Sequence, residues 1–174
     1  MGSSIGPALA KQLIASLGAS KVSVQGVDYT ATIQSNALRG SEGGKVMARL
    51  ANDQLARCSS TKIAIAGYSQ GAMVVHYAVK TAGLSPNVVS SAVVYGDPQN
   101  RESVGSLPAS KTKVISHHLE NSFKHDRPSG RNSVNEAMVS AKQAALPSHP
   151  HTLVSSKDKI GGHAVLTAVF SLYS

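Results

Sequence analysis

Four stretches of the chain have the hydrophobic patterns of β-strands. Two are nearly continuous apolar runs, which are typical of strands buried on both faces, and another alternates between apolar and polar positions. The predicted strands cover residues 21–27, 62–66, 88–95 and 112–117. Three further stretches have the apolar faces or apolar runs that are typical of helices. They predict helices within residues 1–19, at 45–57 and at 70–82.

The alternation of strands and helices predicts a single α/β domain over residues 1–174, with three α/β/α layers and a mostly parallel central sheet. Catalytic groups are then expected at the carboxyl ends of the strands. The pattern changes after residue 117. Residues 118–150 are polar apart from a helix-like piece at 134–145, and the apolar residues 160–173 predict a terminal helix that covers the sheet.

A G-x-S-x-G motif at residues 67–71 separates the second predicted strand from the helix that follows it. Strand, tight turn and helix are the context in which this motif forms a nucleophile elbow, with the serine lifted above the end of the sheet. Ser69 is therefore the candidate nucleophile. The Gln70 N–H, at the start of the helix, is the candidate oxyanion donor. The alternative is an ordinary strand-to-helix turn with a chance serine.

Composition narrows the class of protein. A chain of 174 residues and 18.0 kDa, 41% hydrophobic, is long enough for one domain with its own core. The net charge is +8, but no basic block is longer than a dipeptide, so we interpret it as attraction to polyanionic surfaces. With no Trp and 4% aromatic residues, nucleic-acid binding is not expected.

Other site types lack their sequence signals. No His-x-x-x-His pair or carboxylate cluster predicts a metal site, and no cofactor is expected. No apolar run reaches the length of a membrane span, and no signal peptide is recognisable. Cys58 is the single cysteine, so an internal disulfide is excluded and a free thiol is expected. We expect a monomer.

Several longer stretches carry a family signature. They read GSSIGPALA at 2–10, VSVQGVDYTA at 22–31, GSEGGKVMARL at 40–50, CSSTKIAIAGYSQGAMVVH at 58–76 and VVSSAVVYGDPQNRESVGSLPASKTKVI at 88–115. On these residues the chain resembles the fungal cutinase family from residue 1 to about 117. The resemblance implies a secreted serine esterase with a small α/β-hydrolase fold and no lid, which cleaves esters of cutin and short-chain soluble esters. It makes Ser69 the nucleophile and the Gln70 N–H an oxyanion donor.

The chain departs from the family pattern in three places. It begins after the family's first strand, whose following loop supplies a hydroxyl to the oxyanion hole, so it looks N-terminally truncated. Cys58 resembles a family cysteine whose partner lies upstream. After Ile115 the family's Cys-x-x-Gly-Asp-x-x-Cys is replaced by Ser-His-His-Leu-Glu-Asn-Ser-Phe, which places Glu120 at the position of the catalytic acid.

A serine hydrolase also needs a base and an orienting carboxylate, which in this fold follow in the order Ser, acid, His. Glu120 fits the acid, although it can equally be a solvated loop residue, and Asp126 is the second candidate. The base is predicted to be His151, because Pro-His-Thr-Leu is similar to the family's histidine loop, with His163 second and neither as a third possibility.

Asp97, in a Gly-Asp-Pro turn, is a further acidic candidate. We interpret it as a turn-stabilising residue, because Asp before Pro favours turns. Two functions therefore compete. The first is carboxylic ester hydrolysis through an acyl-enzyme on Ser69. The alternative is a catalytically impaired paralogue or truncated gene product that acts at most as a lipid or polyester surface binder, and weak hydrolysis is expected from the departures above.

Overall fold

The computed structural model of the chain describes residues 5–32, 37–115 and 166–172. The helices, in chain order, are α1 (Gly6–Leu17), α2 (Ser41–Arg57) and α3 (Gln70–Lys80), with short 3-10 turns at η1 (Ala19–Lys21) and η3 (Ala109–Lys111). The strands are β1 (Val22–Gly26), β2 (Lys62–Tyr68), β3 (Val89–Tyr95), β4 (Thr112–Ile115) and β5 (Leu166–Leu172). All four strands predicted from the sequence are confirmed.

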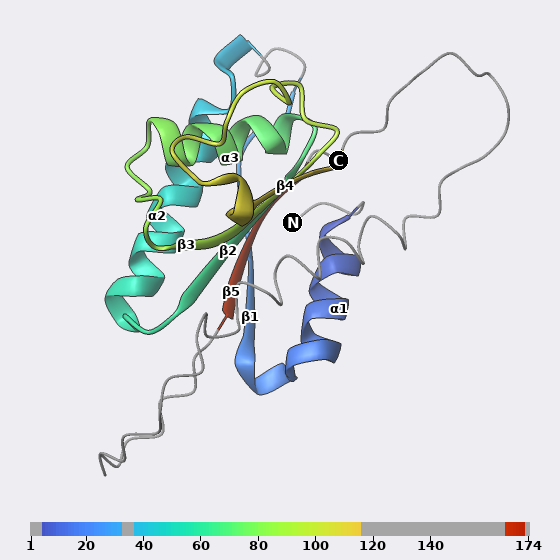
Figure 1. Cartoon of the computed structure of the whole chain (residues 1–174), viewed down its shortest axis with the longest axis vertical. Coiled ribbons are helices and arrows are strands. Elements are labelled where there is room, and N and C mark those ends of the chain that lie inside the picture. The colour runs from blue at the N-terminus through green and yellow to red at the C-terminus, as the bar shows by residue number, and fades with distance from the viewer. Residues whose placement is uncertain (1–4, 33–36, 116–165, 173–174) are drawn as a thin grey trace, which may run out of the picture.

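The described strands form one parallel sheet in the order β1-β5-β2-β3-β4. Helix α1 covers one face of this sheet, and α2 and α3 cover the other, so the predicted three-layer α/β/α architecture is confirmed (Figure 1). Because the strands are parallel, their carboxyl ends lie at one edge of the sheet. That edge carries the turn between β2 and α3.

The prediction of a terminal helix over residues 160–173 is wrong where the structure describes it. Residues 166–172 form β5, which lies between β1 and β2 and pairs with both, Val169 opposite Gln25 on one side and Ile65 on the other. A short apolar run does not distinguish a buried helix from a buried strand. The segment contains Thr167, Val169 and Phe170, residue types that favour strands.

The helix predicted at 45–57 is confirmed, but its predicted start is wrong, because α2 already begins at Ser41. Glycine disfavours helix interiors, which explains the misplaced boundary. Here Gly43 and Gly44 are buried against α3. An added Cβ would lie 2.7 Å from a side-chain atom of Val74 at Gly43, and 2.7 Å from one of Tyr77 at Gly44. The two glycines therefore permit close helix packing.

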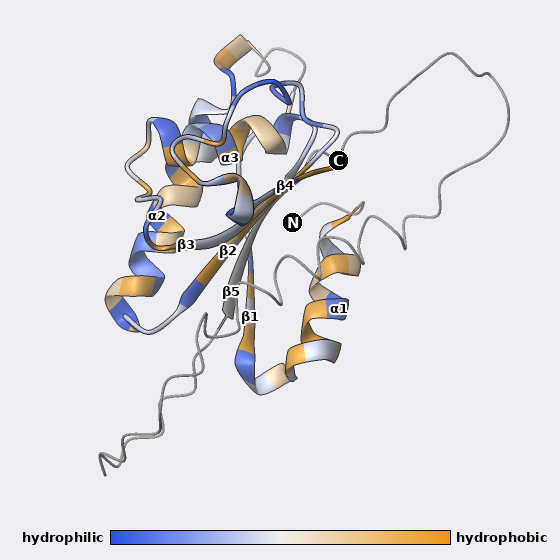
Figure 2. Cartoon of the chain, viewed as in Figure 1, coloured by the Kyte–Doolittle hydropathy of each residue, from blue (hydrophilic) through white to orange (hydrophobic). Residues whose placement is uncertain are grey.

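Two apolar cores lie on opposite faces of the sheet. In β2, Ile63 and Ile65 belong to the core beneath α2 and α3, whereas Ala64 and Ala66 belong to the core beneath α1. This is the alternation expected of a strand buried on both faces. Figure 2 shows the corresponding apolar residues along the central strands and on the sheet-facing sides of the helices. Because alternate residues of β2 face opposite sides, helices can pack on both faces of the sheet, as the three-layer prediction requires.

The central position of β5 can be tested by removing one backbone donor. Val169→Pro removes an N–H from a strand that is paired on both sides, so the ladder loses a donor in the middle of the sheet. We expect a loss of about 1–3 kcal/mol in the free energy of unfolding, measured by urea denaturation. Val169→Ile, which keeps the N–H, is the control. Equal urea midpoints for the two variants would contradict the assignment.

The close contact between β2 and α3 gives a second prediction. A Cβ at Gly67 would collide with the Gly71 carbonyl group and lie 2.7 Å from the Ala72 nitrogen. Backbone atoms cannot move aside cheaply, so Gly67→Ala is expected to lower the free energy of unfolding by about 3 kcal/mol or more, at the upper end of the cost of overpacking.

The matched control is Gly83→Ala. At Gly83 the backbone φ of +83° is unfavourable for a residue with a side chain, but the space is open: nothing lies within 4 Å of a Cβ added there. Only backbone strain of about 1–2 kcal/mol is expected there. Chemical denaturation of both variants in parallel checks the difference. A Gly67→Ala protein at least as stable as Gly83→Ala would refute the close contact.

Candidate functional site

Ser69 occupies the sharp turn between the end of β2 and the start of α3. Its φ of 53° and ψ of −115° lie in a region that non-glycine residues rarely adopt. Such a conformation costs of order 1–3 kcal/mol and persists only where the surrounding structure enforces it. The residue is half-buried. The strand, strained turn and helix are those predicted from the sequence for a nucleophile elbow.

Two backbone hydrogen bonds hold this turn. The Ser69 N–H donates to the carbonyl of Tyr95 at the end of β3, at 2.9 Å, and the Ser69 carbonyl accepts from Ala72 at 2.9 Å. The first bond ties the turn to the neighbouring strand, and the second begins α3. The serine is therefore fixed between the sheet and the helix.

Gln70 is the first residue of α3, and its side chain is 2% exposed. Its amide Nε2 donates to the Thr32 carbonyl at 3.2 Å, which attaches the segment after β1 to the start of α3. N–H groups in the first turn point toward the N-terminal end of a helix, where the helix dipole favours negative charge. The backbone of Gln70 is thus placed at the end of α3 where Ser69 lies.

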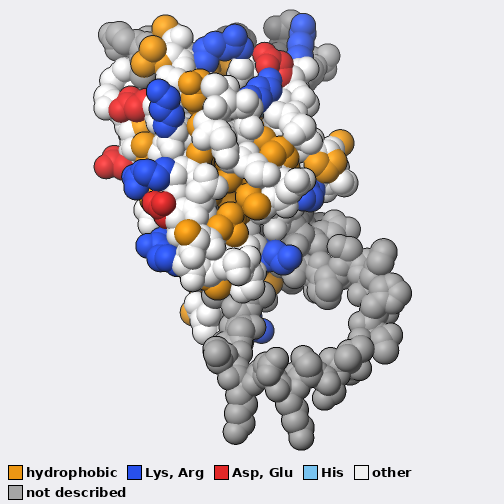
Figure 3. Space-filling model, turned by 90° about the vertical axis from the view of Figure 1, so that its left-hand side faces the viewer, with side chains coloured by type: hydrophobic (Ala, Val, Ile, Leu, Met, Phe, Trp, Pro, Cys, Tyr) orange, Lys and Arg blue, Asp and Glu red, His pale blue; other side chains and the backbone are white. Residues whose placement is uncertain are grey.

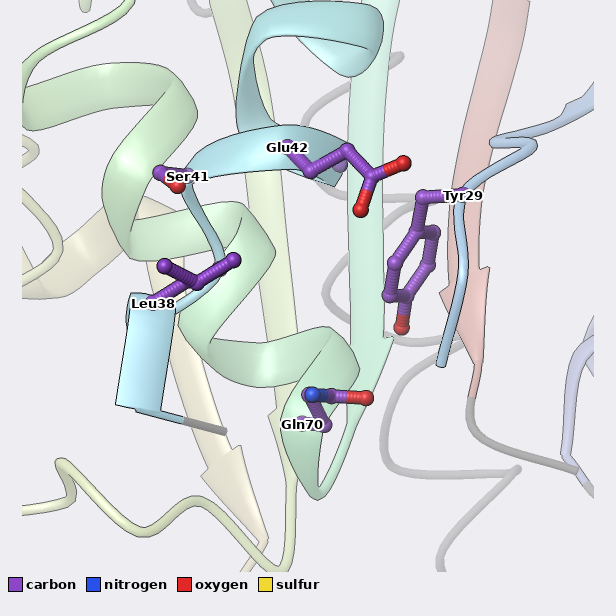
Figure 4. Close-up of a pocket in the computed structure, with 7 residues that line it drawn as sticks. Tyr29, Leu38, Ser41, Glu42 and Gln70 are labelled. Atoms are coloured by element: carbon purple, nitrogen blue, oxygen red, sulfur yellow. The ribbon is translucent and has the colours of Figure 1, made fainter. Parts of the chain in front are cut away.

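A small hollow lies beside Gln70, between α3 and the start of α2 (Figure 4). Its lining residues are Tyr29, Leu38, Gly40, Ser41, Glu42, Gly43 and Gln70. In Figure 4, Leu38 and Tyr29 stand on opposite sides of it and Gln70 lies at one end. Leu38, which lines this hollow, is 55% exposed. An apolar surface is therefore available next to the elbow.

The remaining predicted catalytic residues cannot be placed relative to Ser69. Glu120, His151 and the second candidates Asp126 and His163 all lie outside the described residues. Their roles as acid and base stay predictions, as does the nucleophilic role of Ser69. The helix-like piece predicted at 134–145 also lies outside the described residues.

Asp97 is buried in a pair that the sequence analysis did not anticipate. Its Oδ2 lies 2.9 Å from Nε2 of His76, which is in the second turn of α3, and the two side chains are 1% and 2% exposed. Its Oδ1 accepts a hydrogen bond from the Gln99 N–H at 2.8 Å, in agreement with a turn-stabilising role. The sequence feature that could have indicated this buried pair is a histidine, His76, within the apolar run of α3.

Glu102 makes a second, exposed connection between the loop after β3 and α3. Its carboxylate accepts from Lys80 Nζ at 2.6 Å and lies 3.3 Å from an Arg39 guanidinium nitrogen. The hydrogen bond from Lys80, and then the charge of Lys80, hold the pKa of Glu102 below its usual value. Because the groups are exposed, these ion pairs are expected to add little stability.

Cys58 follows α2 and is partly exposed, with its sulfur 3.4 Å from the Ser60 hydroxyl oxygen. Hydrogen bonds from Ser60 and then Thr61 lower the pKa of this thiol. Cys58 is a free cysteine in the structure, and its role as a free thiol in solution stays a prediction.

On the face formed by α2 and α3, charged side chains of both signs are intermixed. Figure 3, which views the side carrying α2 and α3, shows basic side chains scattered among uncharged, apolar and acidic ones. Among residues 5–32, 37–115 and 166–172, no three His, Cys, Asp or Glu side chains gather as metal ligands. No helix in these same ranges has the length and apolar character needed to cross a bilayer.

Comparison with known proteins shows the family. A family model described as Cutinase matches residues 1–122. The cutinase of Monilinia fructicola is 39% identical over 128 residues, which cover 72% of this chain and 63% of that protein. Cutinase 4 of Emericella nidulans is 43% identical over 112 residues, which cover 64% of this chain and 49% of that protein. The chain thus spans roughly half to three fifths of the curated relatives it matches.

A solved structure agrees with this result. The structure of the Trichoderma reesei cutinase in complex with a phosphonate inhibitor superposes with a TM-score of 0.66 at 29% identity, over 83% of this chain and 68% of that one. Because the family model matches well over half of the chain and includes the strand, turn and helix around Ser69, this protein belongs to the cutinase family.

Proposed function

We propose that this protein is a carboxylic ester hydrolase that cleaves cutin or short-chain esters through an acyl-enzyme on Ser69. The observation that carries the proposal is the strained turn at Ser69, between a central strand and α3, in a chain of the cutinase family. The half-buried position of Ser69 leaves part of it open to solvent, and the exposed Leu38 offers an apolar contact for an acyl chain nearby.

In this proposal the Ser69 hydroxyl oxygen attacks the ester carbonyl carbon while its proton passes to His151. The negative charge that develops on the carbonyl oxygen is stabilised by the Gln70 N–H at the end of α3. Collapse of the tetrahedral intermediate breaks the bond to the alcohol, which leaves with the proton from His151. Water then repeats the sequence on the acyl-enzyme, and Glu120 orients the imidazole throughout.

The substrate and location follow from the same family membership. Cutin is an extracellular polyester, so we propose that the protein acts outside the cell, as a monomer and without a cofactor. The net charge of +8 supports attraction to a polyanionic wall surface.

The nucleophile is tested with a fluorophosphonate probe, which phosphonylates an activated serine. The wild-type chain is expected to be labelled, with the adduct on the peptide that contains Ser69, and Ser69→Ala should abolish the signal. Ser91→Ala is a control, since Ser91 is 1% exposed in the middle of β3. Labelling that persists in Ser69→Ala, or an unlabelled wild-type protein of proven fold, would refute the proposal.

The base is tested by exchanging the two candidate histidines separately. His151→Ala is expected to lower kcat for a p-nitrophenyl ester by about 10²-fold or more from the weak rate expected of the wild-type chain, because the serine loses its proton acceptor. His163→Ala should stay within about tenfold of wild type, because in this proposal His163 takes no proton from Ser69. The reverse result would make His163 the base, and two unaffected variants would exclude both.

A further inference from the structure

The buried His76–Asp97 pair lies on the structural path that holds Ser69. Tyr95 accepts the hydrogen bond from the Ser69 N–H, and Asp97 follows Tyr95 by two residues. Asp97 in turn contacts His76, which lies about two turns along the helix that Ser69 begins. Residues 69–76 and 95–97 therefore form a closed ring, completed by one backbone and one side-chain hydrogen bond.

The ring is closed by a hydrogen bond between two particular side-chain atoms, Nε2 of His76 and Oδ2 of Asp97. Asp97 accepts through both carboxylate oxygens, from the Gln99 N–H at 2.8 Å and from His76 at 2.9 Å, so the imidazole donates from Nε2. Burying these polar groups has a desolvation cost that a pair of packed apolar side chains would avoid. Unlike an apolar contact, the hydrogen bond fixes the distance between two particular atoms.

The strain at Ser69 explains why such a fixed distance is useful. A φ of 53° must be enforced from outside, and the Tyr95 carbonyl is the group that accepts from the Ser69 amide. Gly96, between Tyr95 and Asp97, itself has a φ of 50°. Two contacts hold this turn: the Gly96 N–H donates to the Ile115 carbonyl at 2.9 Å, and Asp97 lies 2.9 Å from His76 of α3. Of these two, only the Asp97 contact attaches the turn to the helix that Ser69 begins. The exposed Glu102 contacts attach the same loop, but solvent weakens them.

We propose that His76 and Asp97 are positioning residues for the nucleophile: they hold the end of β3 against α3 so that Ser69 keeps its reactive conformation. Neither residue is proposed to touch the substrate. The inference rests on the proposed function of Ser69, and it extends that function to a buried pair two helical turns away.

The experiment uses three variants of the full chain. His76→Leu/Asp97→Asn removes the hydrogen bond without leaving a buried charge, and it keeps an oxygen that can accept from the Gln99 N–H. His76→Gln places an amide N–H at the position of Nε2 and should rescue the bond. Glu102→Gln is the matched control, because it weakens the exposed attachment of the same loop and leaves the buried pair intact.

The first readout is catalytic. The double variant is expected to lower kcat for a soluble p-nitrophenyl ester, and the rate of fluorophosphonate labelling, by about 10–100-fold with KM unchanged, because small displacements of a nucleophile have effects of this size. His76→Gln should recover most of the rate, and Glu102→Gln should stay within about twofold of wild type. A folded double variant that reacts at the wild-type rate would overturn the proposal.

The second readout does not need activity, so it separates this inference from the proposed function. Hydrogen exchange of the Ser69 amide is compared with that of the Ile65 amide in β2. The double variant should lose at least tenfold protection at Ser69 relative to Ile65, whereas Val79→Ala, a core truncation on the same helix, should change the two amides together. Unchanged relative protection in the double variant would refute the pair's role even if the wild-type chain proves inactive.

Discussion

The strained backbone of Ser69 is the constraint on which the described structure depends. A serine with φ 53° cannot hold that conformation alone, so the elements around it must fix the turn from several sides. Gly67 lets β2 approach the first turn of α3 at a distance that no side chain would permit. Tyr95 then binds the Ser69 amide from the adjacent strand. The packing of α3 on β2 and the pairing of β2 with β3 are thus parts of one support.

Much of this support could be predicted from local sequence. The apolar run of β2 and the glycines at 67 and 71 specify a buried strand, a tight turn and a helix, because each residue type satisfies a requirement of its own position. The strands and the three layers follow by the same reasoning. The G-x-S-x-G motif in this context makes Ser69 the candidate nucleophile, and family resemblance adds the class of reaction, which no hydrophobic pattern contains.

The features that could not be predicted depend on contacts between residues far apart in the sequence. Gly43 and Gly44 suggest a loop until α3 is packed against them. Residues 166–172 belong to an apolar run that we interpret from the sequence as a helix, and only the pairing with β1 and β2 on either side makes the segment a strand. His76 and Asp97 each have an ordinary local explanation. Only the folded chain brings them to 2.9 Å, and only then does their relation to Ser69 become visible.

The positions of β4 and β5 also limit where the candidate acid Glu120 and the candidate base His151 can lie, although both residues are outside the described structure. β4 ends with Ile115 at the carboxyl edge of the sheet, where its carbonyl accepts from the Gly96 N–H next to Tyr95. Glu120 follows Ile115 by five residues, a span of at most about 18 Å, which keeps the candidate acid within reach of the elbow. β5 begins with Leu166 at the opposite edge of the parallel sheet.

His151 precedes Leu166 by fifteen residues. If it is the base, these residues must run from the edge of the sheet where Ser69 lies to the opposite edge, where β5 begins. A seven-residue strand such as β2 is about 23 Å long, whereas fifteen extended residues span up to about 50 Å, so the connection is long enough. His163 has only three residues before β5 begins, a reach of about 10 Å. Chain length therefore favours His151 over His163 as the base for Ser69, independently of the family resemblance that first singled it out.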